Sequence, residues 1–64
     1  MKYTILCSCL CDDGYVWYAI HTLDSDIWRW IRNQSSEKWV DTAGISSFDI
    51  REDLFTIFAI RWSA

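Results

Sequence analysis

The sequence predicts a small α+β fold, in which an antiparallel sheet of ββαββ order carries one helix packed on one face. Three observations support this prediction. An Asp13-Gly14 pair separates two β-rich runs, an amphipathic segment begins near Asp24, and residues 54–62 form a long apolar run. Because 64 residues is the length of one domain, residues 1–64 are expected to form a single domain.

Residues 3–11 and 15–22 are predicted to form a β-hairpin, since an Asp-Gly pair between two β-forming runs is a strong hairpin signal. A two-residue loop of Asp13 and Gly14 would place Cys9 opposite Tyr18. One face of the hairpin would then hold Ile5, Cys7, Cys9, Cys11, Val16, Tyr18 and Ile20, and the other Leu6, Leu10, Trp17, Ala19 and His21. Both faces are substantially apolar, so both need to be covered.

A helix is predicted to follow the hairpin. Asp24 or Ser25 can cap its first turn, where Asp26 also suits the helix dipole. A buried stripe at helical spacing consists of Ile27, Trp30, Ile31 and Gln34. The polar segment 33–36 is expected to end the helix.

The second half of the chain is less clearly patterned. Residues 38–40 fit either a short strand or a helical turn. Residues 42–44 are expected to form a turn, and residues 45–51 a short strand. Residues 54–62 are rich in β-forming side chains and apolar on both sides, which predicts a central strand.

The residue types that carry chemistry are few. Cys7, Cys9 and Cys11 would point to the same side of a strand, where free cysteines commonly act as small buried hydrophobes. A thiol or metal-binding module is the alternative, although structural zinc requires four converging ligands. His21 is the only histidine, and no nucleophile motif or glycine-rich anion loop accompanies it. We therefore expect no enzymatic activity, no cofactor and no metal site.

Charge and hydropathy limit the kinds of partner. The net charge is −3 and the six basic residues are scattered, so direct binding to nucleic acid is not expected. No apolar stretch approaches the length of a membrane-spanning helix, so no membrane association is expected. The apolar stretch between Met1 and Cys7 is too short for a secretory signal, which predicts a cytoplasmic protein.

Hydrophobic residues make up 52 % of the chain and five of the residues are Trp, more than a domain of this size can bury. We therefore expect a non-enzymatic protein-binding module, a stoichiometric inhibitor or modulator of another protein, as is typical of inhibitors encoded by phages and mobile elements. A homodimer that buries the uncovered sheet face is also expected. The alternative is a structural subunit of an assembly. The predicted interface consists of Trp17, Trp39 and Trp62 as anchors with Asp12, Asp13, Glu52 and Asp53 at the rim.

Overall fold

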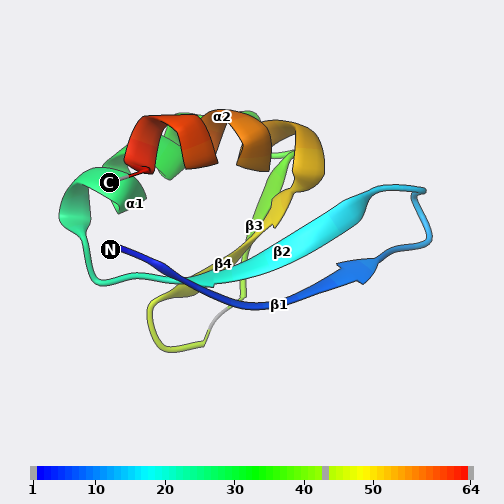
Figure 1. The fold of residues 1–64 in the computed structure, drawn as a ribbon, viewed down its shortest axis with the longest axis horizontal. Helices are drawn as coiled ribbons and strands as arrows, with labels where there is room; N and C mark the ends of the chain where they lie inside the picture. Colours follow the sequence, from blue (N-terminus) through cyan, green and yellow to red (C-terminus); the bar gives the residue numbers. More distant parts are fainter. Residues whose placement is uncertain (1, 43, 64) are drawn as a thin grey trace.

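The computed structural model describes residues 2–42 and 44–63 of the chain. Met1, Ala43 and Ala64 lie outside the described residues, and Ala43 belongs to the turn predicted over residues 42–44. The elements follow the order ββαββα (Figure 1). They are β1 (Thr4–Leu10), β2 (Val16–His21), α1 (Ser25–Arg32), β3 (Trp39–Asp41), β4 (Ser47–Arg51) and α2 (Glu52–Trp62). The predicted α+β class is confirmed.

The four strands form one antiparallel sheet in the order β1-β2-β4-β3. Both helices lie on the same face of this sheet, as Figure 1 shows. Their buried side chains meet those of the two central strands in a core of Ile20, Ile27, Ile31, Phe48, Ile50, Leu54 and Phe58. The opposite face of the sheet is covered by no helix within the described residues.

The hairpin loop is one residue longer than predicted. The amide of Gly14 donates to the carbonyl of Cys11, and the amide of Cys11 donates to the carbonyl of Tyr15. The loop therefore consists of Asp12, Asp13 and Gly14, with Gly14 in the left-handed region at φ 84°. Three-residue hairpin loops commonly place such a residue last.

This longer loop overturns the predicted faces of the hairpin. Cys9 lies opposite Trp17 rather than Tyr18, and Cys7 lies opposite Ala19. A shift of one residue moves side chains to the other side of the sheet. The cysteines were expected to be buried beside Tyr18, but they lie on the open face with Trp17. A bulge between Ile5 and Cys7 then returns Ile5 to the side of Ile20.

The prediction of a strand over residues 54–62 is wrong, because Glu52–Trp62 is the helix α2. The predicted ββαββ order still holds, but its last two strands are β3 and β4, and a second helix follows. Continuous apolar runs do not distinguish a buried strand from a buried helix by periodicity. Two features favour the helix here: Glu52 and Asp53 occupy its first turn, and the buried Leu54 and Phe58 are four residues apart.

The predicted first helix is confirmed, and Thr22 fixes how it begins. Asp24 is the N-cap, and its carboxylate accepts hydrogen bonds from the amides of Asp26 and Ile27 at 2.9 and 3.1 Å. The buried hydroxyl of Thr22 donates to the carbonyl of Lys2 at 2.6 Å and accepts from the amide of Asp24 at 3.1 Å. Thr22, which directly follows β2, therefore holds the segment before β1 and the N-cap of α1 together.

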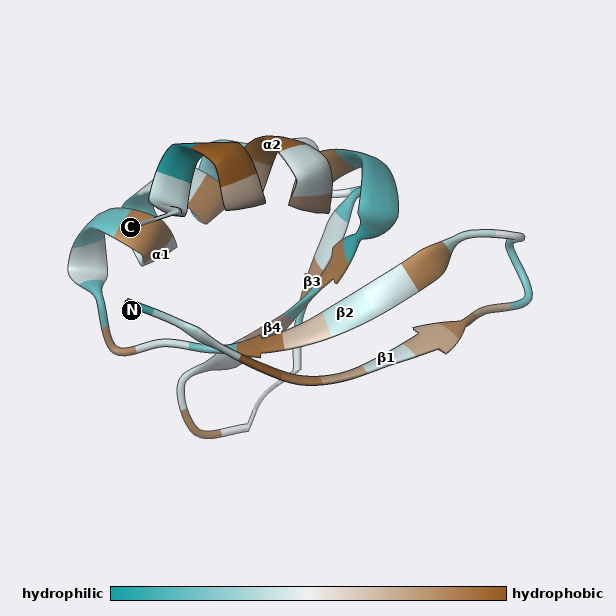
Figure 2. Cartoon of the chain, viewed as in Figure 1, coloured by the Kyte–Doolittle hydropathy of each residue, from teal (hydrophilic) through white to brown (hydrophobic). Residues whose placement is uncertain are grey.

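Hydrophobic side chains also remain outside this core. Figure 2 shows that the β1–β2 hairpin extends beyond the helices while still carrying hydrophobic residues. Every residue of β1 is exposed, including Ile5, Leu6 and Leu10. The expectation that this chain cannot hide all its apolar surface is therefore met at the hairpin.

Candidate protein-binding surface

The open face of the sheet carries a shallow hollow of about 500 Å³. Its floor is a row of residues paired across the four strands, which are Cys7, Ala19, Asp49 and Val40. A neighbouring pair, Cys9 and Trp17, extends the floor toward the hairpin loop, where Cys11, Asp12 and Asp13 complete the lining. We call these nine residues the sheet hollow. It combines small apolar groups and one indole with three carboxylates.

Trp17 is held in place by the hairpin loop. Its indole Nε1 donates to Asp13 Oδ2 at 2.9 Å, and Asp13 Oδ1 accepts the amide of Tyr15 at 2.9 Å. These hydrogen bonds favour the charged carboxylate and lower the pKa of Asp13. The half-buried indole therefore has a fixed orientation while part of its surface faces solvent.

Asp49 is the carboxylate at the centre of the sheet. It stands between Ala19 and Val40 in the strand register, and burial raises its pKa. Among residues 2–42 and 44–63, no basic side chain forms an ion pair with it. The sheet hollow thus contains a partly desolvated negative charge beside apolar groups, an arrangement that a cation from outside would stabilise.

The three thiols of β1 and the hairpin loop all line the sheet hollow. The sulfur atoms of Cys9 and Cys11 are 3.7 Å apart, and Cys7 is exposed farther along the strand. Burial, together with Cys9 and the nearby aspartates, raises the pKa of Cys11, which disfavours the reactive thiolate. In the described part of the chain, no three His, Cys, Asp or Glu side chains are grouped to hold a metal ion.

The predicted rim residues Glu52 and Asp53 lie at the start of α2, beside the hairpin end of the sheet. A carboxylate oxygen of Glu52 accepts the amide of Val16. Asp53 forms a bidentate pair with Arg51, with both N–O distances at 2.9 Å, which holds the pKa of Asp53 well below its usual range. The guanidinium of Arg51 also lies 4.1 Å from the centre of the Tyr15 ring. Both carboxylates therefore bind strand residues and hold the start of α2 against the sheet.

The predicted anchors Trp39 and Trp62 are not brought together with Trp17. Both rings are half-buried and pack against the core. Trp39 pairs with Ile50 and so lies on the helix side of the sheet, whereas Trp17 lies on the open side. Trp62 lies at the end of α2, with the ammonium of Lys2 at 5.5 Å from its ring centre. Of the seven predicted interface residues, the sheet hollow contains Trp17, Asp12 and Asp13.

Sequence reasoning missed Asp49, Val40 and Ala19 as members of this surface. In the sequence, Phe48 and Ile50 alternate with Asp49 and Arg51, which puts Asp49 on the polar side of a short strand. The strand order that puts it at the centre of the sheet has no local signal. The three cysteines were singled out, although the predicted register placed them on the wrong face.

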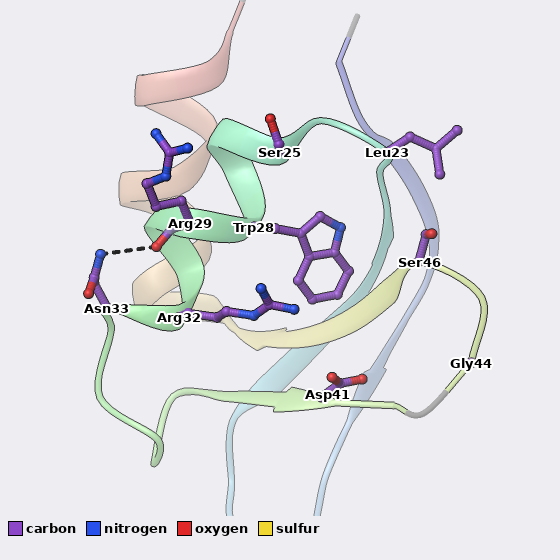
Figure 3. A pocket seen from close by; sticks show the side chains of 9 residues that line it. All are labelled: Leu23, Ser25, Trp28, Arg29, Arg32, Asn33, Asp41, Gly44 and Ser46. Carbon is purple, nitrogen blue, oxygen red and sulfur yellow. Dashed lines mark hydrogen bonds between the residues drawn. The ribbon is translucent and has the colours of Figure 1, made fainter.

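A second hollow, of about 710 Å³, lies between α1 and the segment that joins β3 to β4 (Figure 3). Trp28 forms its inner wall, and its Nε1 donates to the carbonyl of Thr22 at 2.9 Å. Arg32 stacks on the Trp28 ring at 5.4 Å, and Arg29 pairs with Asp26 at 3.6 Å. The side-chain amide of Asn33 donates to the carbonyl of Arg29 at 3.0 Å, the dashed line in Figure 3. These polar groups therefore already have partners within the protein, whereas no ion pair is found for Asp49 among residues 2–42 and 44–63.

None of the helices formed by the described residues has the length and apolar character needed to cross a membrane. Comparison of the chain with protein-family models, curated proteins and solved structures finds no match. The geometry of the sheet hollow is therefore the basis for proposing a function.

Proposed function

We propose that the protein is a non-enzymatic protein-binding module that inhibits or modulates its partner by binding to it stoichiometrically. We propose the sheet hollow as the binding surface. The observation that carries this proposal is the position of Trp17 on an uncovered sheet face, held by Asp13 at 2.9 Å. Trp is enriched among the residues that dominate binding energy at interfaces. Because its orientation is already fixed, less conformational entropy is lost on binding.

Asp49 indicates the chemistry of the partner. Its carboxylate is partly desolvated and has no basic partner among residues 2–42 and 44–63. Asp12 and Asp13 add negative charge along the rim of the same hollow. A partner surface with a Lys or Arg beside an apolar group would neutralise Asp49 while covering Trp17 and Val40. We therefore propose a basic protein segment as the occupant.

The central test is to compare matched variants in binding. The tagged protein captures partners from its native host, mass spectrometry identifies them, and calorimetry then measures the dissociation constant for each purified candidate. Trp17→Ala should weaken binding by at least about 30-fold, the equivalent of a hot spot of about 2 kcal/mol. Ile60→Ala is the matched control, because Ile60 is an exposed apolar residue of α2 and lies outside the sheet hollow.

Asp49→Asn tests the charge. Loss of the carboxylate should weaken binding and make the affinity less dependent on salt. The same change should stabilise the free protein at neutral pH, since burial disfavours the charged form of Asp49. A partner that binds Trp17→Ala and Asp49→Asn as tightly as the original protein would contradict the proposed surface. If only Ile60→Ala lost binding, the binding surface would lie on α2 instead.

A structural subunit of an assembly is the second candidate. It is favoured by exposed apolar residues outside the sheet hollow, among them Leu23, Ile45 and Ile60. A binding module should be monodisperse and folded after purification, whereas an obligate subunit should aggregate unless its neighbours are present. Light scattering of the purified protein distinguishes the two.

A further inference from the structure

The strand β1 is an edge of the sheet that neither charge nor proline protects. It pairs only with β2 in the order β1-β2-β4-β3, and all seven of its residues are exposed. Its sequence, Thr-Ile-Leu-Cys-Ser-Cys-Leu, contains no charged residue and no proline. Natural edge strands usually carry such residues, because an open edge invites pairing with another strand. The bulge between Ile5 and Cys7 is the one edge-protecting feature of β1, and from Cys7 to Leu10 the strand is regularly paired with β2.

The backbone groups that this edge presents follow from the hairpin. The amide of Cys11 donates to the carbonyl of Tyr15. Hydrogen-bonded and non-hydrogen-bonded pairs alternate along an antiparallel ladder, so the backbone groups of Cys9 and Cys7 also face β2. The N–H and C=O groups of Ser8 and Leu10 therefore point away from the sheet, toward the free edge.

We propose that two copies of this chain pair through β1, antiparallel and about a two-fold axis, to form one continuous eight-stranded sheet. Charge favours a second copy at this edge. The strand is neutral, so two copies meet here without repulsion. Stacking the open faces instead would bring together Asp12, Asp13 and Asp49 of both copies. Two-fold symmetry is the commonest closed arrangement of identical chains.

Full overlap of the two strands sets the register. The centre of Thr4–Leu10 is Cys7, so the two Cys7 residues lie opposite each other across the two-fold axis, and Ser8 of one copy lies opposite Leu6 of the other. In this register the outward backbone groups of Ser8 become hydrogen-bonded beside the bulge residue Leu6, while the two Cys7 residues form a non-hydrogen-bonded pair. The Cα atoms of such a pair are about 4.5 Å apart, within the range of a disulfide.

The proposed pairing does not rest on the proposed function, although Cys7 belongs both to the paired edge and to the sheet hollow. The two-fold axis stands perpendicular to the continuous sheet, so the helices of both copies lie on one side and both sheet hollows open on the other. Pairing also covers part of the apolar surface of β1, where Leu6 is 56 % and Leu10 73 % exposed.

Sedimentation measured from micromolar to millimolar concentration tests the pairing. The original protein should reach twice its mass of 7.6 kDa. Ser8→Pro should be monomeric, because proline removes the outward amide without removing a hydrogen bond to β2. A monomeric original protein, or a folded Ser8→Pro variant that still dimerises, would overturn the proposal. Loss of the dimer with unchanged partner binding would separate this edge from the sheet hollow.

Thiol cross-linking tests the register even where Ser8→Pro does not fold. A Cys9→Ser/Cys11→Ser variant retains Cys7 alone, and a Cys7→Ser/Cys11→Ser variant retains Cys9 alone. Diamide accepts two electrons and two protons as two thiols form a disulfide. The Cys7 variant should become a covalent dimer rapidly. The two Cys9 residues would be about 13 Å apart along the paired strands, so that variant should remain uncoupled. Equal cross-linking of both variants, or none, would overturn the full-overlap register.

Discussion

Replacing Phe58 should unfold the protein or bring it close to unfolding. The side chain is fully buried at the meeting point of α2 and the sheet. Its ring centre lies 4.6 Å from that of Tyr3, 6.0 Å from that of Phe55 and 6.1 Å from that of Phe48. Truncation of a buried Phe to Ala costs about 3–5 kcal/mol. The free energy of unfolding of a domain this size is about 3–10 kcal/mol.

Phe58→Leu keeps the measurement possible. It retains most of the apolar volume and should lower the free energy of unfolding by about 1–2 kcal/mol. Urea unfolding followed by circular dichroism measures this change. With a slope of about 1 kcal/mol per molar urea, the unfolding midpoint should fall by about 1–2 M.

Ile60→Ala is the matched change on the same element. Ile60 is 75 % exposed, so its removal should alter the free energy of unfolding by no more than about 0.5 kcal/mol. In a strand, Phe58 and Ile60 would share one face, whereas a helix separates them by about 200° around its axis. Equal destabilisation by Phe58→Leu and Ile60→Ala would refute the helical assignment of residues 52–62.

Three further changes probe the turn, the helix cap and the ion pair. Gly14→Ala should destabilise the fold by about 1–2 kcal/mol in urea unfolding, since φ is 84° and the cost arises from the backbone rather than from a clash; Gly14→Asn should cost less. Asp24→Ala should cost about 1 kcal/mol in thermal unfolding, and Asp24→Asn less, because asparagine can still cap α1. Asp53 has a pKa lowered by Arg51, so its carboxylate stabilises the fold above the unfolded-state pKa of about 4. That stabilisation is lost as the pH falls through the lower folded-state value, and Asp53→Asn should flatten the acid side of the stability curve.

The sequence predicted elements where short-range chemistry determines them. The Asp13-Gly14 pair marked the hairpin, and Asp24 marked the start of α1. The register failed because two-residue and three-residue loops can contain the same Asp-Gly pair. The difference of one residue decides whether Cys9 faces Tyr18 or Trp17. Local composition therefore predicted the strands but not which of their faces is covered.

The C-terminal run shows a different limit. Leu54, Phe55, Ile57, Phe58 and Ile60 favour a strand by residue type, yet this segment lies across β2 and β4 as a helix. Its environment is created by residues far away in the chain, such as Tyr3 and Tyr18, whose rings pack against those of Phe58 and Phe55. For the same reason the sheet hollow was only partly predictable. Trp17 and the loop aspartates could be named from residue type. Asp49 differs from other surface carboxylates only because the folded sheet partly buries it and raises its pKa.

The hydrogen bonds of Thr22 tie together segments that are remote in the chain. Its hydroxyl donates to Lys2, its carbonyl accepts Trp28, and its amide donates to the carbonyl of Ser46 at 3.0 Å. These bonds span the N-terminal segment, α1 and the approach to β4, so local fraying of one element leaves the others to hold Thr22. Amides released only by complete opening exchange with solvent deuterium at the rate set by global unfolding. The Thr22 amide should therefore be among the slowest to exchange. Its exchange would then report the free energy of global unfolding, and other amides that exchange equally slowly would belong to the same cooperative unit.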